Sequence, residues 1–153
     1  MFSKHESVRL KKEFWTVFGQ YMAPVLSADL EKVNWINYRT GEKNIFFRMQ
    51  ADNRIASIRI EITHKDDGLR QLYYEQFLQF RNLLHQITGE EWTWQEAYTD
   101  EWGVSSGRIY KEAHDLNILR KEDWPALISF FKPRLIALDE FWSQVKFGFE
   151  SLR

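Results

Sequence analysis

The sequence predicts an α+β domain, with an antiparallel sheet of about five strands and three helices in the order α-βββ-α-ββ-α. Two observations predict this class. Residues 44–64 hold two runs in which apolar and polar side chains alternate, as in half-buried strands. Residues 66–87 and 124–152 instead repeat apolar side chains every three or four positions, as in helices that cover a core.

Composition narrows the function classes. We expect residues 1–153 to form a single domain with its own core. The chain has no cysteine, which excludes disulfides, thiolate zinc sites and cysteine nucleophiles, and which favours the cytoplasm. A net charge of −1 predicts no broad attraction to nucleic acid, and no apolar run is long enough for a signal peptide or a membrane span. The aromatic residues, 16% of the chain, are interpreted as core rather than as a binding face.

The first helix is predicted to begin at Ser3 or Ser7, because Ser3 and Glu6 have the spacing of a capping box. Pro24 either ends or kinks it, since proline removes a backbone hydrogen bond and clashes with the preceding turn. Residues 33–39 are predicted to form the first strand, followed by a turn that contains Gly41.

The second and third strands, within residues 45–52 and 54–64, are predicted to pair through a turn at Asn53 and Arg54. Asp66 or Asp67 then caps one long helix, which Gly89 ends.

The last two strands are residues 92–98 and 107–113. Trp102, in the loop between them, is either an exposed recognition ring or a plug on the sheet; the second alternative is favoured because tryptophan is usually buried. Asp123 caps the final helix, and Pro133 should bend it. The near-heptad apolar stripe of this helix fits either a homodimer or packing against the first helix.

The turn at Asn53 and Arg54 also predicts the register of the hairpin. It sets Phe47 opposite Ile60 on a continuously apolar face, whereas a slip of one residue would set Phe47 against Arg59 and bury a charge. The apolar pairs in this register are Ile45 with Ile62, Phe47 with Ile60 and Met49 with Ile58.

The opposite face of the hairpin is predicted to carry a row of Trp35, Arg48 and Arg59, flanked by Phe46 and Glu61. Two arginines directly opposite one another repel unless something intervenes. Three candidates are a diagonal ion pair between Glu61 and Arg48, stacking of Trp35 on Arg48, and a bound anion. The face is therefore either a solvated polar surface or a contact surface for an anion or nucleic acid.

Catalytic chemistry has weak support. The four histidines show no metal-ligand spacing, and no phosphate loop or nucleophile elbow is present, so no metal or other cofactor is expected. A nuclease-like metal site would need Asp52, Glu61 and Lys65 together. Asp52 lies roughly 30 Å along the strand from Glu61, too far to share a metal.

The chain resembles the bacterial domain-of-unknown-function family 4268 over most of its length. The resemblance rests on Phe14-Trp15, the run IRIEI at 58–62, Glu91-Trp92-Thr93-Trp94, Arg108-Ile109 and Asp123-Trp124. It implies at most a nucleic-acid-related context, and it carries over no catalytic residues.

Three hypotheses follow. The first is a cytoplasmic interaction or accessory module that contacts nucleic acid, another anion or a protein partner, and is not an enzyme. The second is a metal-dependent or degenerate nuclease, and the third is a structural homodimer joined through the last helix. The candidate binding residues are Trp35, Phe46, Arg48, Arg59, Glu61 and Trp102.

Overall fold

A computed structural model describes residues 2–153 and confirms the α+β class. Within those residues, four helices and four strands follow the order α-ββ-αα-ββ-α, in which the two consecutive helices take the place of the single central helix that was predicted. The helices are α1 (Lys4–Met22), α2 (Asp67–Gln79), α3 (Arg81–Thr88) and α4 (Trp124–Val145), with short 3₁₀ segments η1 (Lys121–Asp123) and η2 (Lys146–Leu152). The strands are β1 (Ile45–Ala51), β2 (Ile55–Ile62), β3 (Thr93–Thr99) and β4 (Ser105–His114).

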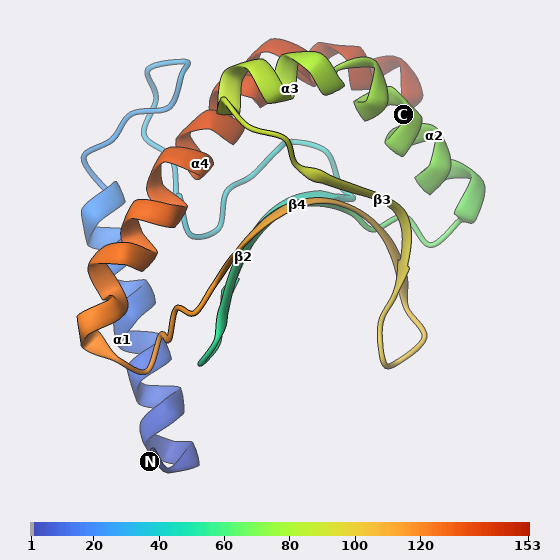
Figure 1. Ribbon diagram of the computed structural model, residues 1–153. Coiled ribbons are helices and arrows are strands. Elements are labelled where there is room, and N and C mark those ends of the chain that lie inside the picture. The colour runs from blue at the N-terminus through green and yellow to red at the C-terminus, as the bar shows by residue number, and fades with distance from the viewer. Residues whose placement is uncertain (1) are drawn as a thin grey trace.

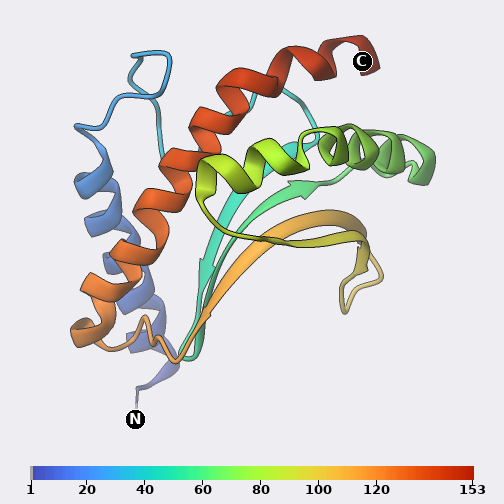
Figure 2. The ribbon, with the colours of Figure 1, turned by 45° about the horizontal axis from the view of Figure 1, so that its top comes forward.

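The antiparallel strands form one sheet in the order β1-β2-β4-β3. The sheet is arched, and the helices lie over its convex side (Figure 1). The concave underside carries no helix in either ribbon view of the described chain (Figures 1 and 2). One face of the sheet is therefore buried, and the other is open.

The predicted register of the hairpin is confirmed. Phe47 pairs with Ile60, and Arg48 pairs with Arg59, as the turn at Asn53 and Arg54 required. The apolar members of the register point to the helices, where Ile58, Ile60 and Ile62 are fully buried. The polar members consequently lie on the concave side.

The predicted first strand is wrong, because residues 33–39 form a loop that crosses the core. The backbone N–H of Asn37 donates to the side-chain oxygen of Asn34 at 3.1 Å, a local bond that turns the chain and competes with an extended conformation. Trp35 is only 3% exposed, and its indole N–H donates to the Val25 carbonyl at 3.0 Å. The loop is thus held by its buried rings and not by strand pairing.

The first two predicted caps are confirmed, whereas Asp123 makes no capping bond to α4, because its carboxylate accepts instead from the Asn117 backbone N–H at 2.9 Å. The Ser3 hydroxyl accepts from the Glu6 backbone N–H at 3.1 Å, and α1 ends at Met22, before Pro24. Asp66 caps α2, and α4 continues across Pro133.

One predicted helix is in fact two. Phe80, with φ −107° and ψ 14°, leaves the helical conformation and separates α2 from α3. Its ring packs against Phe149 of η2, with ring centres 6.2 Å apart. The break lets the two helices follow the curve of the arch (Figure 1).

The core lies between the convex face and the helices and is rich in rings, as predicted. Its largest fully buried side chains include Phe14, Phe18, Phe77, Phe131, Phe141 and Phe149. Burying each such ring stabilises the fold by roughly 1.5–3 kcal/mol. The apolar stripe of α4 is used in this core, which explains its near-heptad spacing without a second chain.

Among residues 2–153, no helix is both long and apolar enough to cross a lipid bilayer.

An irregularity in β3 shapes one end of the arch. The pairing with β4 shifts register between Gln95 and Tyr98, and such bulges bend and twist a strand. Gly107 lies at this point, where an added Cβ would be 3.3 Å from the Glu96 carbonyl oxygen. The absence of a side chain at Gly107 therefore lets the backbone of β3 at Glu96 lie close to β4. Beyond the bend, the β3–β4 loop hangs beside the open underside (Figure 1).

Candidate functional site

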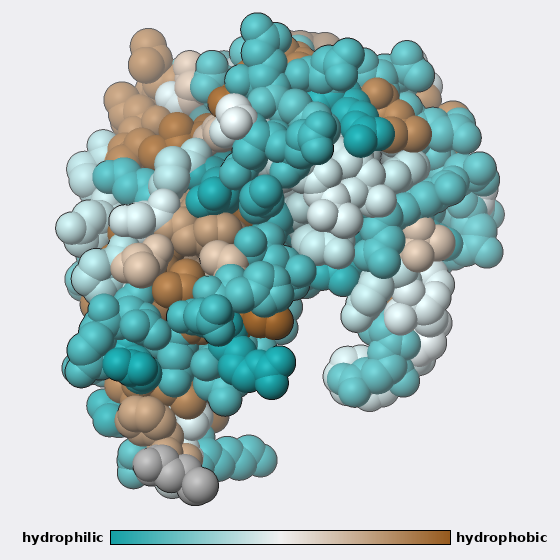
Figure 3. All heavy atoms as spheres, viewed as in Figure 1, coloured by the Kyte–Doolittle hydropathy of each residue, from teal (hydrophilic) through white to brown (hydrophobic). Residues whose placement is uncertain are grey.

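The concave face forms a hollow of about 670 Å³ beneath the arch. Figure 3 shows this recess, with the β3–β4 loop as the arm on the right. We call it the concave site. It is lined by Arg48, Gln50, Arg59, Glu61, Thr63, Tyr98, Asp100, Glu101, Trp102, Val104, Ser105, Ser106 and Arg108.

Three arginines from three adjacent strands meet in the concave site. Arg48 on β1 pairs across the sheet with Arg59 on β2, and Arg108 on β4 lies opposite Glu61 on β2. Sequence reasoning missed Arg108, because it did not place β4 beside β2. The alternation of Arg108 with Ile109 indicated only that Arg108 lay on a polar face.

Glu61 is the central carboxylate for these guanidinium groups. Its Oε2 lies 2.6 Å from Arg48 Nε, so the predicted diagonal ion pair is confirmed. Its Oε1 is 3.7 Å from Arg59 Nε, which is an ion pair but too long for a hydrogen bond. One carboxylate therefore shares its charge between two arginines and faces a third in the register.

Two guanidinium donors of the concave site lack acceptors. Arg59 Nε and Arg108 Nε are both buried without a hydrogen-bond partner in the described part of the chain. The Arg59 side chain is 13% exposed, and its Nη1 makes a single long bond of 3.3 Å to Gln50 Oε1. A buried donor without an acceptor costs about 1–3 kcal/mol, so contacts within the protein leave this group of arginines incompletely satisfied.

The electrostatics of Arg59 agree with this geometry. Burial lowers the pKa of its guanidinium below the ordinary value, and the charges of Arg108 and Arg48 lower it further, while Glu61 opposes them. The group stays charged at neutral pH because arginine titrates far above it. An anion in the hollow would relieve the repulsion between the three arginines.

Aromatic rings hold two of the guanidinium groups in place. The Arg108 guanidinium carbon lies 4.3 Å from the ring centre of Tyr98 and 4.9 Å from that of Tyr110. The Arg48 guanidinium carbon lies 4.4 Å from the ring centre of Phe46. Such cation–π contacts contribute roughly 0.5–1 kcal/mol each at exposed positions. These contacts also fix the planes of the two guanidinium groups and therefore the directions of their N–H donors.

The predicted stacking of Trp35 on Arg48 does not occur. Trp35 lies in the core, where it is almost fully buried, and Phe46 takes the place beside Arg48. The reason is that the segment holding Trp35 is a loop, so the strand pairing on which the prediction depended is absent. Trp35 is therefore not part of the concave site.

Trp102 lies at the rim of the concave site and is 79% exposed, so the prediction that it tucks onto the sheet is wrong. The physical reason is Asp100, whose Oδ1 accepts from the backbone N–H groups of Trp102 and Val104, each at 2.9 Å. Gly103, with φ +80°, completes the turn in a conformation that glycine adopts freely. The loop backbone is therefore held by these hydrogen bonds while the Trp102 ring stays exposed.

The acids proposed for a metal site do not come together. Asp52 and Glu61 lie at opposite ends of the β1–β2 hairpin, and Asp52 Oδ1 accepts from the backbone N–H groups of Arg54 and Ile55 at 2.8 Å each. Across residues 2–153, no three His, Cys, Asp or Glu side chains are grouped as metal ligands. Asp52 builds the turn, and Glu61 orders the arginines.

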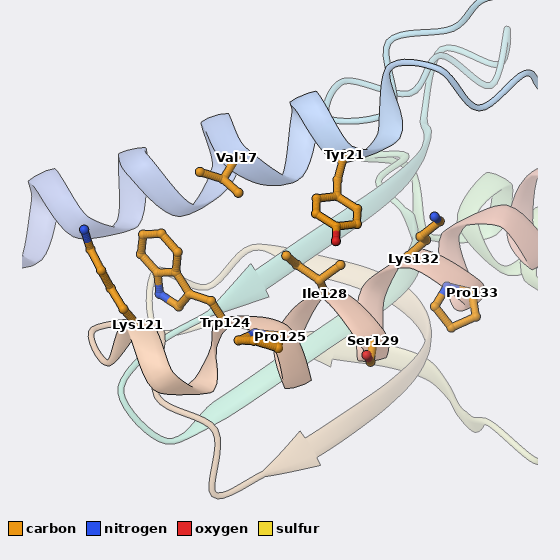
Figure 4. Close-up of a pocket in the computed structure, with 9 residues that line it drawn as sticks. All are labelled: Val17, Tyr21, Lys121, Trp124, Pro125, Ile128, Ser129, Lys132 and Pro133. Carbon is orange, nitrogen blue, oxygen red and sulfur yellow. The ribbon is translucent and has the colours of Figure 1, made fainter.

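A second hollow, of about 660 Å³, lies between α1 and the first half of α4 (Figure 4). Its apolar lining includes Val17, Tyr21 and Ile128, and lysines lie at its two ends. Lys121 Nζ already pairs with Glu13 at 3.0 Å. This groove is hollow and apolar but has few polar groups that could orient a ligand, so the concave site is the stronger candidate for a binding site.

The model of the family described as Domain of unknown function (DUF4268) matches residues 10–146, and the chain therefore belongs to that family. The matched span includes the whole sheet and every residue of the concave site. Comparison with curated proteins and with solved structures finds no match.

Proposed function

We propose that this protein is a binding or accessory module that holds nucleic acid on its concave sheet face through phosphate contacts. The observation that carries the proposal is the group of Arg48, Arg59 and Arg108 around the single carboxylate of Glu61, with two buried Nε donors that have no acceptor. Phosphate oxygens are strong acceptors that match the planar fork of a guanidinium group.

The surroundings of the arginines favour a polyanion over a small enclosed ligand. The hollow is open along the underside of the arch (Figure 3), and the exposed ring of Trp102 extends its rim. Asp100 and Glu101 on the same rim weaken the attraction for phosphate, as does the net charge of −1. We therefore expect modest affinity that depends strongly on salt.

Fluorescence anisotropy with labelled DNA and RNA oligonucleotides tests the proposal, starting at about 20 mM salt, where phosphate contacts are strongest. Replacing Arg48 and Arg59 by alanine should weaken binding and reduce the magnitude of the slope of log K against log salt by about 1.4–1.8. A matched control replaces Arg9 and Arg120, which are both 60% exposed and lie outside the concave site, so that the net charge changes equally.

Two results would overturn the proposal. One is no binding by the unchanged protein at low salt, and the other is an equal loss of affinity in the control variant. The same oligonucleotides with Mg²⁺ or Mn²⁺ address the nuclease alternative, because cleavage that Glu61→Gln abolishes would make the protein an enzyme. Within the proposal the module acts in the cytoplasm, in keeping with a chain that contains no cysteine.

A further inference from the structure

We infer that the concave site selects single-stranded nucleic acid, with an unpaired base stacked on Trp102 while the strand's phosphates contact the arginines. The inference rests on the proposed function and adds the form of the ligand. It depends on two features of the concave site, the short extent of its positive charge and the free ring on its rim.

The positive charge is compact. Arg48, Arg59 and Arg108 come from three neighbouring strands about 4.8 Å apart, and Arg108 lies two residues along its strand from the row of the other two, so their backbones span only about 12 Å. Acidic side chains border this cluster, with Asp100 and Glu101 on the loop and Glu112 further along β4, in register with Ser57.

This distribution of charge disfavours a duplex. Double-stranded DNA carries one negative charge per about 1.7 Å of its axis, so a duplex on this face would bring further phosphates against the bordering acids. A single strand has half that charge density, and it can set one or two phosphates on the cluster. Its remaining binding energy must then come from its bases.

Trp102 is the ring that is free to meet a base. All seven tryptophans lie within the described residues, and Trp102 alone among them is exposed. Tyr98 and Phe46 each already have a guanidinium group over the ring, from Arg108 and Arg48 respectively. Every base has a π-face, so stacking on a single open ring requires no particular sequence.

The loop presents the Trp102 ring ready for binding. The two hydrogen bonds from Asp100 hold the loop backbone, and Trp102 lines the same hollow as Arg59 and Arg108. A base on the ring and a phosphate on the arginines therefore face the same recess. Because the backbone is already ordered, binding needs to immobilise little more than the side chain itself.

The experiment measures affinity for four probes of equal length. They are a single-stranded DNA, a single-stranded RNA of the same sequence, the DNA duplex, and an abasic strand that keeps sugars and phosphates but has no bases. We expect the single strand to bind more tightly than the duplex or the abasic strand. Trp102→Ala should weaken single-strand binding about 5- to 150-fold, the range of one lost stacking contact. Trp102→Phe should retain most of the affinity, and none of these changes should alter abasic-strand binding.

Phe147→Ala is the matched control, since Phe147 is 65% exposed on η2, outside the concave site. Duplex binding as tight as single-strand binding, or an unchanged affinity after Trp102→Ala, overturns this inference while the arginine variants still decide the proposed function. Equal losses in the Trp102 and Phe147 variants also overturn it. Absence of binding to every probe overturns both.

Discussion

Arg59→Met should increase stability while it weakens ligand binding. The Arg59 side chain is 13% exposed and its Nε has no hydrogen-bond acceptor, and two further arginines lie on the same face. Methionine keeps most of the length of the apolar stem and removes both the charge and the orphaned donor. The substitution therefore separates what the guanidinium does for the fold from what it does for recognition.

The magnitude follows from the contacts of Arg59. Removing a buried donor without a partner gains about 1–3 kcal/mol. The losses are one long hydrogen bond to Gln50 at 3.3 Å, about 0.5–1 kcal/mol, and an ion pair to Glu61 at 3.7 Å, about 0–1 kcal/mol. Glu61 keeps its 2.6 Å contact with Arg48, so no carboxylate is left unpaired. We expect a net gain of about 1 kcal/mol, or a Tm higher by roughly 2–4 °C.

Urea unfolding followed by circular dichroism measures this free energy, at low salt where the repulsion is least screened. Arg48→Met is the control with the opposite expectation, because it removes the short bond to Glu61 and should lower stability by about 1 kcal/mol. A loss of more than about 1 kcal/mol in Arg59→Met would refute the reasoning. It would mean that Arg59 stabilises the fold and is not strained there for a ligand.

Three further predictions concern the scaffold. Asp66→Ala should lower the free energy of unfolding by about 1 kcal/mol and Asp66→Asn by much less, because both Asp and Asn accept the Leu69 backbone N–H that caps α2; urea unfolding of the two variants decides this. Phe131→Ala should lower the free energy of unfolding by about 3–5 kcal/mol, since the ring is fully buried. Calorimetry measures this difference, and a smaller decrease would show that the core collapses into the cavity left by the ring. Burial and the charge of Arg70 lower the pKa of His64 below 6.5, so the folded state binds fewer protons than the unfolded chain. The stability of the protein relative to His64→Gln should therefore be full above about pH 6.5 and fall as pH drops through the lowered pKa, and parallel profiles for the two proteins would contradict this.

Much of the hairpin and its flanking caps could be predicted because their determinants are local. Alternation and a tight turn define the register that sets Arg48 opposite Arg59, and a slip would bury charge. The caps at Ser3 and Asp66 likewise depend on side chains within three residues of the bonds they make. Glu61 was found in this way as the partner of Arg48.

The parts of the site that were missed depend on long-range packing. Nothing local places β4 beside β2, and this placement alone brings Arg108 to the arginine pair. Trp35 has the alternating neighbours of a strand, yet a distant carbonyl and the core decide its position. The exposure of Trp102 depends on how Asp100 folds its loop, which average burial frequencies do not describe.

The two faces of the sheet have separate consequences for how such a chain can change. Substitutions at the buried isoleucines of β2 alter the packing of the helices, whereas Arg48, Arg59 and Arg108 hold no helix in place. The concave face can therefore be redesigned while the helices and the buried face of the sheet keep their packing. Changes at Arg48, Arg59 and Arg108 would alter the charge of the concave side, whereas changes at the buried isoleucines would alter the arch itself.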